Sequence, residues 1–416
     1  MTPQYSTDQF ISLYQELERY WLNPDPLALK ILFATLISFK LDCDPIWLFL
    51  VAPPSSLKTE FISGIANIDT VHALSSLSPQ TLVSGLRVKG GKSSSLLERI
   101  QSKVLTFKDF TTVLSGRWDD LSKILGQLRE VYDGSFVAEF GSGVTVNWKG
   151  KITFIAGVTP IIDHHSTVSS MLGERFIQYR LPGVDEEDVA IMAMKQSSNG
   201  EYRQNIRDLF FNFYHSLALP TSLSEITVDD QWIIKLASLA SFVVRARAGT
   251  KRDFKQELEY IPAPEAPARL AKQLIILGKC LTIVNQKKEM GEKEYKIVLK
   301  VAFDCIPNQR IITINSLFEQ VSIPLSTAEV SQKIGYSTRS TRIFLEDLAA
   351  FGLIEVNKKS NQHDWQPTSK LKNYLTKALV DVTHPEAYVK HIFSWFKGKS
   401  EYESVYLDEE FQNTFL

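Results

Sequence analysis

Hydrophobic positions in the first 44 residues recur at helical spacing. Phe10, Leu13, Leu17 and Trp21 fall on one face of a helix with 3.6 residues per turn. The run Asn-Pro-Asp-Pro at 23–26 interrupts this pattern, because proline lacks the amide hydrogen that a helix interior needs. The pattern predicts an N-terminal helical extension over residues 1–44.

The pattern changes after residue 45. Short, continuous apolar runs occur at 46–52, 103–107 and 151–157, separated by segments with helical spacing. Such runs are typical of parallel strands buried on both faces in an α/β fold. Between the last two runs, FVAEFGSGVTVNW alternates apolar and polar residues on either side of 141–143, which predicts a β-hairpin.

The strand pattern weakens after residue 183, and residues 185–285 are predicted to be helical with a loop at 261–268. From residue 326 the sequence indicates two short helices around Gly335, followed by two strands, as in a winged helix. We therefore expect five regions. They are an extension (1–44), an α/β core (45–183), a helical lid (184–300), a winged-helix domain (301–375) and an unassigned tail (376–416).

Composition and charge narrow the function only slightly. Hydrophobic content of 44%, charged content of 22% and a net charge of −1 are ordinary for a globular protein, so any nucleic-acid contact must be local. The three cysteines form no metal-binding pattern, and their separation suits a reducing compartment. The N-terminus has no signal-peptide pattern, and the longest apolar run is too short to span a bilayer. These features predict a cytoplasmic protein with no membrane partner.

The segment LFLVAPPSSLKTE at 48–60 is the strongest candidate for chemistry. It resembles the phosphate-binding motif G-x-x-x-x-G-K-[ST], with Ala52 and Leu57 in place of the glycines. Lys58 would supply a point charge to the phosphates of ATP, and Thr59 a hydroxyl to Mg²⁺. A left-handed conformation at Leu57 would cost about 1–3 kcal/mol. The residues expected to contact the nucleotide are Ser55, Ser56, Leu57, Lys58, Thr59 and Glu60.

Asp109 follows the apolar run at 103–107, where a strand next to the phosphate-loop strand should deliver a carboxylate to Mg²⁺ or to the attacking water. The usual pair is Asp-Glu, and only one carboxylate is present here. Either Asp109 takes the metal position and Phe110 replaces the glutamate, or Asp109 takes the glutamate position and Lys108 replaces the aspartate. The structural alternative is an Asp that caps the following loop.

Four further segments follow in order: TLVSGLRVKGGKSSSLLERI (81–100), FVAEFGSGVTVNWKGKITFIAGVTP (136–160), LGERFIQYRL (172–181) and APARLAKQL (266–274). Together with 48–60 they resemble AAA+ ATPases of the minichromosome-maintenance-like kind, as carried by phages and mobile genetic elements. The resemblance covers roughly 45–285 in segment order, plus 326–366. It implies an AAA+ phosphate-loop core, a helical lid and a C-terminal winged helix.

The resemblance also implies roles for single residues. Thr159 would be sensor 1, usually an asparagine. Arg175 would be the arginine finger that reaches a neighbouring subunit, and Arg269 the sensor-2 arginine. Each has a structural alternative: Thr159 as a strand-end residue, Arg175 as a surface arginine, and Arg269 as the ion-pair partner of Glu265. An arginine finger implies a homo-oligomer, expected to be a hexameric ring.

DNA contact is expected at two places. The resemblance implies that the hairpin tip at 141–143 points into the channel of the ring. In a helix-turn-helix the second helix enters the major groove, led by its N-terminal residues, and lysines of the wing contact phosphates. The residues expected to face DNA are Gly141, Ser142, Gly143, Arg339, Ser340, Arg342, Lys358 and Lys359.

The expected function is that of a DNA-associated AAA+ ATPase, helicase- or translocase-like, from a phage or mobile-element replication system. Losing electrostatic or positioning groups typically costs about 10²–10³-fold each in rate, so hydrolysis is expected to be weak or absent. One alternative is a DNA-binding regulator or initiator that acts through its winged helix. Its ATP site would be catalytically degenerate or would bind ATP without hydrolysing it. Another is a defence or scaffold NTPase whose winged helix binds protein.

Overall fold

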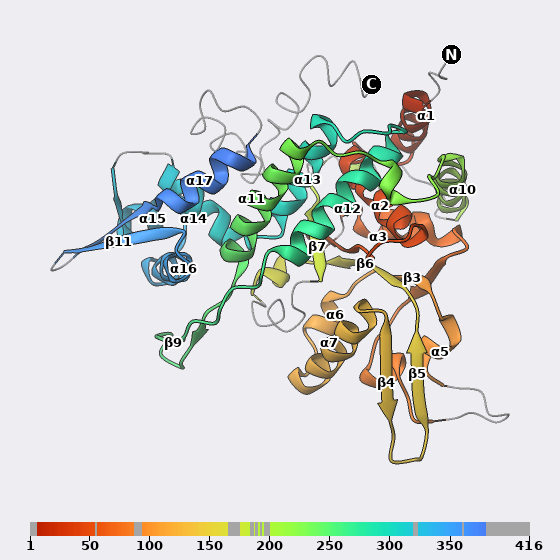
Figure 1. The fold of residues 1–416 in the computed structure, drawn as a ribbon, viewed down its shortest axis with the longest axis horizontal. Coiled ribbons are helices and arrows are strands. Elements are labelled where there is room, and N and C mark those ends of the chain that lie inside the picture. Colours follow the sequence, from red (N-terminus) through yellow and green to blue (C-terminus); the bar gives the residue numbers. More distant parts are fainter. Residues whose placement is uncertain are drawn as a thin grey trace. The chain divides into compact units, whose positions relative to one another are not determined.

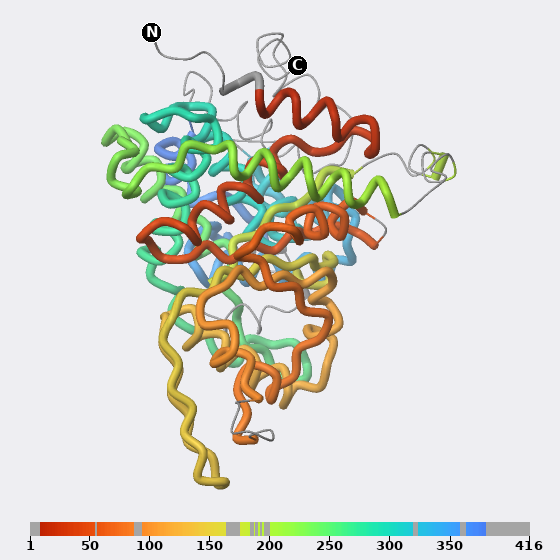
Figure 2. Tube along the Cα trace, turned by 90° about the vertical axis from the view of Figure 1, so that its right-hand side faces the viewer, coloured from red at the N-terminus to blue at the C-terminus, as the bar shows by residue number. Residues whose placement is uncertain are grey.

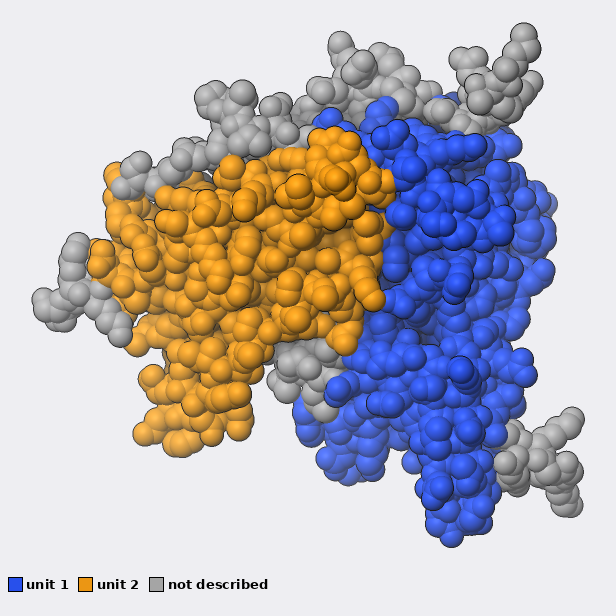
Figure 3. Space-filling view, in the orientation of Figure 1, with its two compact units in different colours: residues 1–227, 276–294 blue, residues 228–275, 295–416 orange. Residues whose placement is uncertain are grey.

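The computed structural model describes residues 6–54, 56–86, 94–164, 175–183, 200–318, 323–359 and 362–379, with the single residues 187, 190, 191 and 194. The chain forms two compact units (Figure 3). Unit 1 comprises residues 1–227 and 276–294, and unit 2 comprises residues 228–275 and 295–416.

A five-stranded parallel sheet forms the centre of unit 1. Its order is β2 (Val71–Leu74), β3 (Lys103–Phe107), β6 (Ile152–Val158), β1 (Trp47–Val51) and β7 (Phe176–Arg180). The three strands expected from continuous apolar runs are present, which confirms the α/β class. The expectation that the strand before Asp109 neighbours the phosphate-loop strand is wrong, because β6 pairs with both β3 and β1 and so lies between them.

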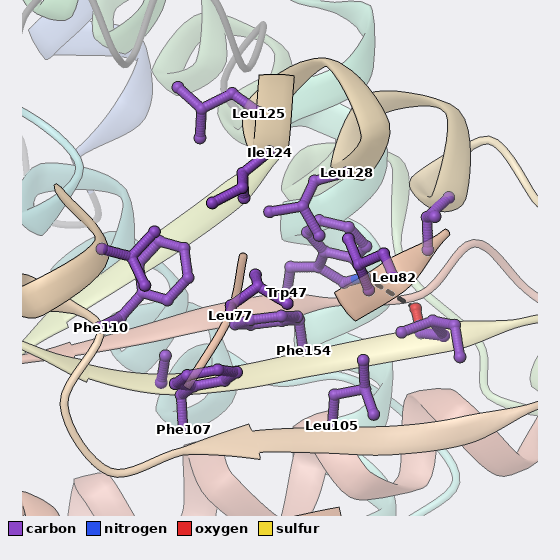
Figure 4. Close-up of a cluster of buried hydrophobic side chains, with 14 of the residues drawn as sticks. Trp47, Leu77, Leu82, Leu105, Phe107, Phe110, Ile124, Leu125, Leu128 and Phe154 are labelled. Atoms are coloured by element: carbon purple, nitrogen blue, oxygen red, sulfur yellow. Dashed lines mark hydrogen bonds between the residues drawn. The ribbon is translucent and has the colours of Figure 1, made fainter. Parts of the chain in front are cut away.

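One face of the sheet carries a large aromatic and aliphatic core (Figure 4). Trp47 is fully buried there, and its indole N–H donates to the Ile152 carbonyl at 2.7 Å. The elements that contribute buried side chains to this core include α4 (Pro79–Leu82), α5 (Leu96–Ile100), α6 (Thr111–Leu114), α7 (Trp118–Tyr132) and β5 (Thr145–Lys149). Large hydrophobic residues in continuous runs therefore fix the positions of the strands.

On the other face lie α2 (Pro26–Lys40) and α3 (Lys58–Gly64), the latter continuing as a 3-10 turn over Ile65–Asn67. The predicted N-terminal extension is helical: α1 (Ser6–Glu18) packs on α10 (Glu201–Ser216), and α2 begins after the break at 23–26. Asp25 caps α2 by accepting from the Leu27 amide. Within α2, buried Lys30 donates to the Asn285 side chain at 2.8 Å, and burial lowers the pKa of Lys30 to about 7.

The predicted hairpin is formed by β4 (Ser135–Glu139) and β5, and it extends from unit 1 as the yellow pair of tubes in Figure 2. Its tip is attached to the segment around Gly85. The Ser142 hydroxyl donates to the Gly85 carbonyl at 2.9 Å, and a Cβ at Gly85 would lie 2.6 Å from the Phe140 ring. Glycine at 85 therefore permits close packing against the hairpin tip.

Unit 2 is helical with two small sheets. Gly335 is left-handed and ends the first of the two predicted short helices, and a three-stranded antiparallel sheet of order β10-β12-β11 follows the predicted strand pair. A two-stranded hairpin, β8 and β9, falls where only helices and a loop were expected. The elements are α11 (Asp230–Arg247), β8 (Lys251–Arg252), β9 (Leu258–Tyr260), α14 (Asn308–Phe318), β10 (Leu325–Ser326), α15 (Thr327–Ile334), α16 (Thr338–Ala350), β11 (Ile354–Lys359), β12 (Gln362–Pro367) and α17 (Ser369–Ala378).

Two further helices cross from one unit to the other along the chain: α12 (Ala268–Val284) and α13 (Glu292–Asp304). Short 3-10 turns occur at Pro160–His164 and Leu223–Glu225. Of the tail expected at 376–416, the part beyond position 379 lies outside the described residues. Within the described ranges, every helix is too short or too polar to cross a bilayer.

Candidate nucleotide site and nucleic-acid interfaces

The loop after β1 adopts a conformation that tolerates its non-glycine residues. The Ala52 amide donates to the Val158 carbonyl at 3.1 Å, which extends the pairing of β1 with β6. Leu57 has φ −67°, in the right-handed region, and directly precedes α3. The left-handed strain considered for Leu57 is therefore absent at that residue.

Lys58 is the buried cation of this loop, with only 6% of the residue exposed. Its ammonium donates to the carbonyls of Ala52 at 2.5 Å and Pro53 at 2.7 Å. Burial lowers the pKa of Lys58, and the nearby carboxylate of Asp109 partly offsets that shift. The hydroxyl of Ser56 is buried and has no hydrogen-bond partner among the described residues, so the loop contains an unsatisfied donor next to its cation.

Asp109 is exposed at the carboxyl edge of the sheet, just after β3. Its carboxylate accepts from the Thr111 amide at 3.0 Å, so the capping role is confirmed. The same carboxylate lies close enough to Lys58 to affect the pKa of that lysine. One side chain thus caps the following turn and lies near the loop cation.

The two neighbours of Asp109 have opposite environments. Phe110 is fully buried and packs against Phe107 and Phe154 (Figure 4). It also packs against Phe49. Lys108 is exposed, although its backbone passes close to β6: a Cβ at Gly157 would lie 2.5 Å from the Lys108 carbonyl oxygen. The side chain at 110 therefore belongs to the core, and the side chain at 108 does not.

Thr159 follows β6, the strand between β3 and β1. Its amide donates to the hydroxyl of Thr111 at 3.0 Å, and the two hydroxyl oxygens lie 3.4 Å apart. Because the carboxyl ends of parallel strands meet at one edge, Thr159 lies between the phosphate loop and Asp109. No sequence pattern marks Thr111, which is an ordinary residue of a short helix.

Arg175 occupies a different environment from the one expected of an arginine finger. It is 4% exposed, pairs with Asp133 at 2.8 Å, and places its guanidinium over the Tyr132 ring at 5.4 Å. Arg180, at the end of β7 and paired in register with Val51, lies nearer to the phosphate loop. It forms two hydrogen bonds to Asp163, at 2.6 and 2.9 Å. Its position at a strand end was the only available signal.

The remaining predicted nucleotide-site residues have other partners, are exposed, or lie outside the described residues. Arg269 belongs to unit 2 and pairs with Glu265 at 2.5 Å, which confirms the ion pair considered as its structural alternative. Glu60 pairs with Arg203 of α10 at 3.2 Å, and Thr59 is exposed. Ser55 lies outside the described residues.

The predicted DNA-facing residues form two separate sets. Gly143 at the hairpin tip has φ +78°, so glycine suits the turn, and Gly141 and Ser142 are exposed beside it. In unit 2, Ser337 caps α16 by accepting from the Ser340 amide at 3.1 Å.

The two arginines of α16 are both exposed. Arg339 donates to the Lys255 carbonyl at 3.3 Å, and Arg342 pairs with Glu346 at 2.7 Å. Lys358 and Lys359 lie in β11, and their side chains are outside the described set. The basic face of α16 is therefore partly neutralised.

Mg²⁺ ligands are few at this site. Thr59 and Asp109 are the candidates, and nowhere among the described residues do three His, Cys, Asp or Glu side chains gather as a metal site. The cation and hydroxyls around the loop are groups that suit the phosphates of a nucleotide, while a single carboxylate leaves most metal positions to water and phosphate. No protein family matches the sequence, and no curated protein is detectably similar to it.

Proposed function

We propose that this protein is a DNA-associated AAA+ protein that binds Mg-ATP in unit 1 and hydrolyses it slowly. One observation carries the proposal: Lys58, Thr159 and Asp109 follow three adjacent strands, β1, β6 and β3, and meet at the carboxyl edge of the parallel sheet. In open α/β sheets that edge is where ligands bind. A helicase- or translocase-like role in phage or mobile-element replication remains the expectation from sequence resemblance.

Each group has a defined part in the proposed site. Lys58 exchanges its two carbonyl partners for phosphate oxygens, which are stronger acceptors for an ammonium because they are charged. Ser56 donates its unpartnered hydroxyl to the same phosphates. Asp109 orients the attacking water, with Thr159 held beside it through Thr111. Bound Mg²⁺ would neutralise phosphate charge, with Thr59 as its protein ligand.

The burial pattern favours one of the two alignments of the acidic strand. Phe110 points into the core and cannot occupy a position that faces nucleotide. We therefore assign Asp109 to the glutamate position and exposed Lys108 to the position of the metal-binding aspartate. A lysine at that position repels Mg²⁺, which supports slow hydrolysis.

A second candidate function is a non-hydrolysing regulator or initiator, with ATP as an assembly ligand. The burial of Arg175 and its ion pair with half-exposed Asp133 favour it, because an arginine finger must be free to reach a neighbouring subunit. The hexameric ring stays a proposal under either function. In both, α15 and α16 with the sheet β10-β12-β11 act as a winged helix that contacts DNA.

The test is Mg-ATP binding and phosphate release by the full-length protein, with and without single-stranded and duplex DNA. Lys58→Ala removes the loop cation, and Lys123→Ala, at an exposed position of α7, is the control for loss of a lysine elsewhere on unit 1. We expect binding that Lys58→Ala weakens and Lys123→Ala does not, with turnover that is slow in all cases. DNA-stimulated turnover would establish the motor, binding alone the regulator, and no nucleotide binding would refute the proposed site.

A further inference from the structure

The β8–β9 hairpin of unit 2 carries an exposed apolar and aromatic surface. Phe254 at its tip is 89% exposed, and Tyr260, Ile261 and Leu258 are also exposed. Figure 1 shows this hairpin extending out from unit 2 beyond α16. Exposed apolar side chains that are grouped together, rather than scattered singly, commonly mark an interaction site.

The tip is a well-formed turn that holds Phe254 outward. The carboxylate of Asp253 accepts from the amides of Lys255 and Glu257, each at 2.8 Å. Gln256 adopts φ +68°, which closes the turn. The exposure of Phe254 is thus produced by specific hydrogen bonds within the turn.

The hairpin is tied to α16 by the side chain of Arg252. Its guanidinium donates to Asp347 at 2.7 Å and to Glu346 at 3.0 Å, both on α16, and to the Ile343 carbonyl at 3.3 Å. Asp347 also accepts from buried Arg310 of α14 at 2.8 Å. This network joins the hairpin to the two-helix element as one body, so a partner held by α16 also meets the hairpin.

The charged residues around Phe254 indicate which kind of partner the hairpin contacts. Lys255 has its ammonium 5.6 Å from the Phe254 ring centre, and Arg339 donates to the Lys255 carbonyl. Neither cation has a carboxylate partner among the described residues, whereas Arg252 and Arg342 are paired with acids on α16. Of the acids on the hairpin, Glu259 pairs with Lys251, Asp253 accepts from two amides of the turn, and Glu257 is exposed. An aromatic ring beside Lys255 and Arg339 suits a nucleic acid, which offers a flat base and phosphates together.

We propose that the β8–β9 hairpin is a second DNA-contacting element, which stacks Phe254 on an unstacked base next to the DNA bound by α16. Lys255 and Arg339 contact the flanking phosphates. Apolar side chains inserted at a base step are a known means of kinking or opening DNA. This inference rests on the proposed DNA contact of α16.

The experiment measures binding of the full-length protein to a fluorescein-labelled forked duplex by anisotropy, over a range of salt concentrations. Phe254→Ala is compared with Phe254→Trp, which keeps stacking, and with Ile234→Ala, which removes another exposed apolar side chain, from α11. We expect Phe254→Ala to weaken binding about 5- to 100-fold with an unchanged salt slope. Phe254→Trp and Ile234→Ala should bind as the wild type does. Lys255→Ala should lower the salt slope by about 1.

Three results would overturn the inference, and they can be told apart. If Phe254→Ala binds normally while Arg339→Ala binds weakly, the hairpin has no role and the α16 contact stands. If the wild type binds no DNA, both the hairpin and the proposed DNA function fall. If Phe254→Ala leaves DNA affinity unchanged but abolishes self-association in light scattering, the surface docks protein.

Discussion

The alignment of the acidic strand can be tested by restoring each half of the missing Asp-Glu pair separately. Lys108→Asp places a carboxylate at an exposed position beside Asp109, and Phe110→Glu places one at a fully buried position. If Asp109 occupies the glutamate position, only the first variant completes the pair. The two variants are therefore opposite in expected outcome, although each introduces one acidic residue.

The structure sets the expected magnitudes. Removing a core phenylalanine costs about 3–5 kcal/mol, and Phe110 contacts three other aromatic rings. Burying a carboxyl group adds to this cost, so Phe110→Glu removes a large part of a typical total stability of about 5–15 kcal/mol. Lys108→Asp changes an exposed side chain and should alter stability by less than about 0.5 kcal/mol.

The assay is phosphate release at saturating Mg-ATP, with urea unfolding followed by tryptophan fluorescence. Lys108→Asp should raise Mg²⁺-dependent turnover, by up to about 10²–10³-fold if the missing carboxylate acts like other positioning groups. Lys123→Asp makes the same charge change elsewhere on unit 1 and should leave turnover unchanged. A Phe110→Glu protein that is as stable as the wild type and more active than Lys108→Asp would refute the assignment.

Three further predictions concern stability and local structure. Lys30 has a folded pKa of about 7, against 10.5 for an exposed lysine, so between these values the unfolded state binds more protons than the folded state. The free energy of unfolding therefore rises with pH in this range, by at most roughly 1.4 kcal/mol per pH unit. Urea unfolding of the wild type and of Lys30→Met from about pH 6.5 to 9.5 checks this. The wild type should gain stability relative to Lys30→Met over this range, and an equal pH dependence of the two proteins would refute the burial argument. Gly85→Ala should displace the Phe140 ring and speed hydrogen exchange at the hairpin tip, and unchanged exchange at 140–144 would contradict that. Asp347→Ala leaves two buried arginines without their shared carboxylate and should cost about 3–5 kcal/mol in the unfolding of unit 2, measured by urea titration.

The central strands were predictable and the peripheral ones were not, for a physical reason. β1 and β6 are buried on both faces and therefore appear as continuous apolar runs. β2 and β7 lie at the two edges, where burial is partial and the runs VHAL and FIQYR include polar residues. The β8–β9 hairpin is mostly exposed, so no hydrophobic pattern marks it.

The candidate site was predictable only in part, because some of its residues are placed by strand ends and others by tertiary packing. Lys58, Asp109 and Thr159 each follow a buried strand, so the strand pattern alone places them at one edge. The partner of Arg175 is 42 positions away in the chain, and its pairing depends on tertiary packing that no local pattern encodes. The right-handed conformation of Leu57 likewise follows from how the loop joins α3.

The groups retained and lost at the loop differ in kind, and that difference bears on which function survives. In the proposed site, Lys58 and the hydroxyl of Ser56 would contact phosphates in the ground state and the transition state alike, and they would therefore contribute to affinity. The altered positions are those expected to act on the attacking water, the metal or the transition-state charge: Lys108 in place of a carboxylate, Thr159 in place of an amide, and Arg175 held by Asp133. Since each such loss reduces rate far more than binding, nucleotide affinity should outlast turnover. Under this proposal ATP would act mainly as a ligand that stabilises unit 1, and we predict measurable binding with little phosphate release.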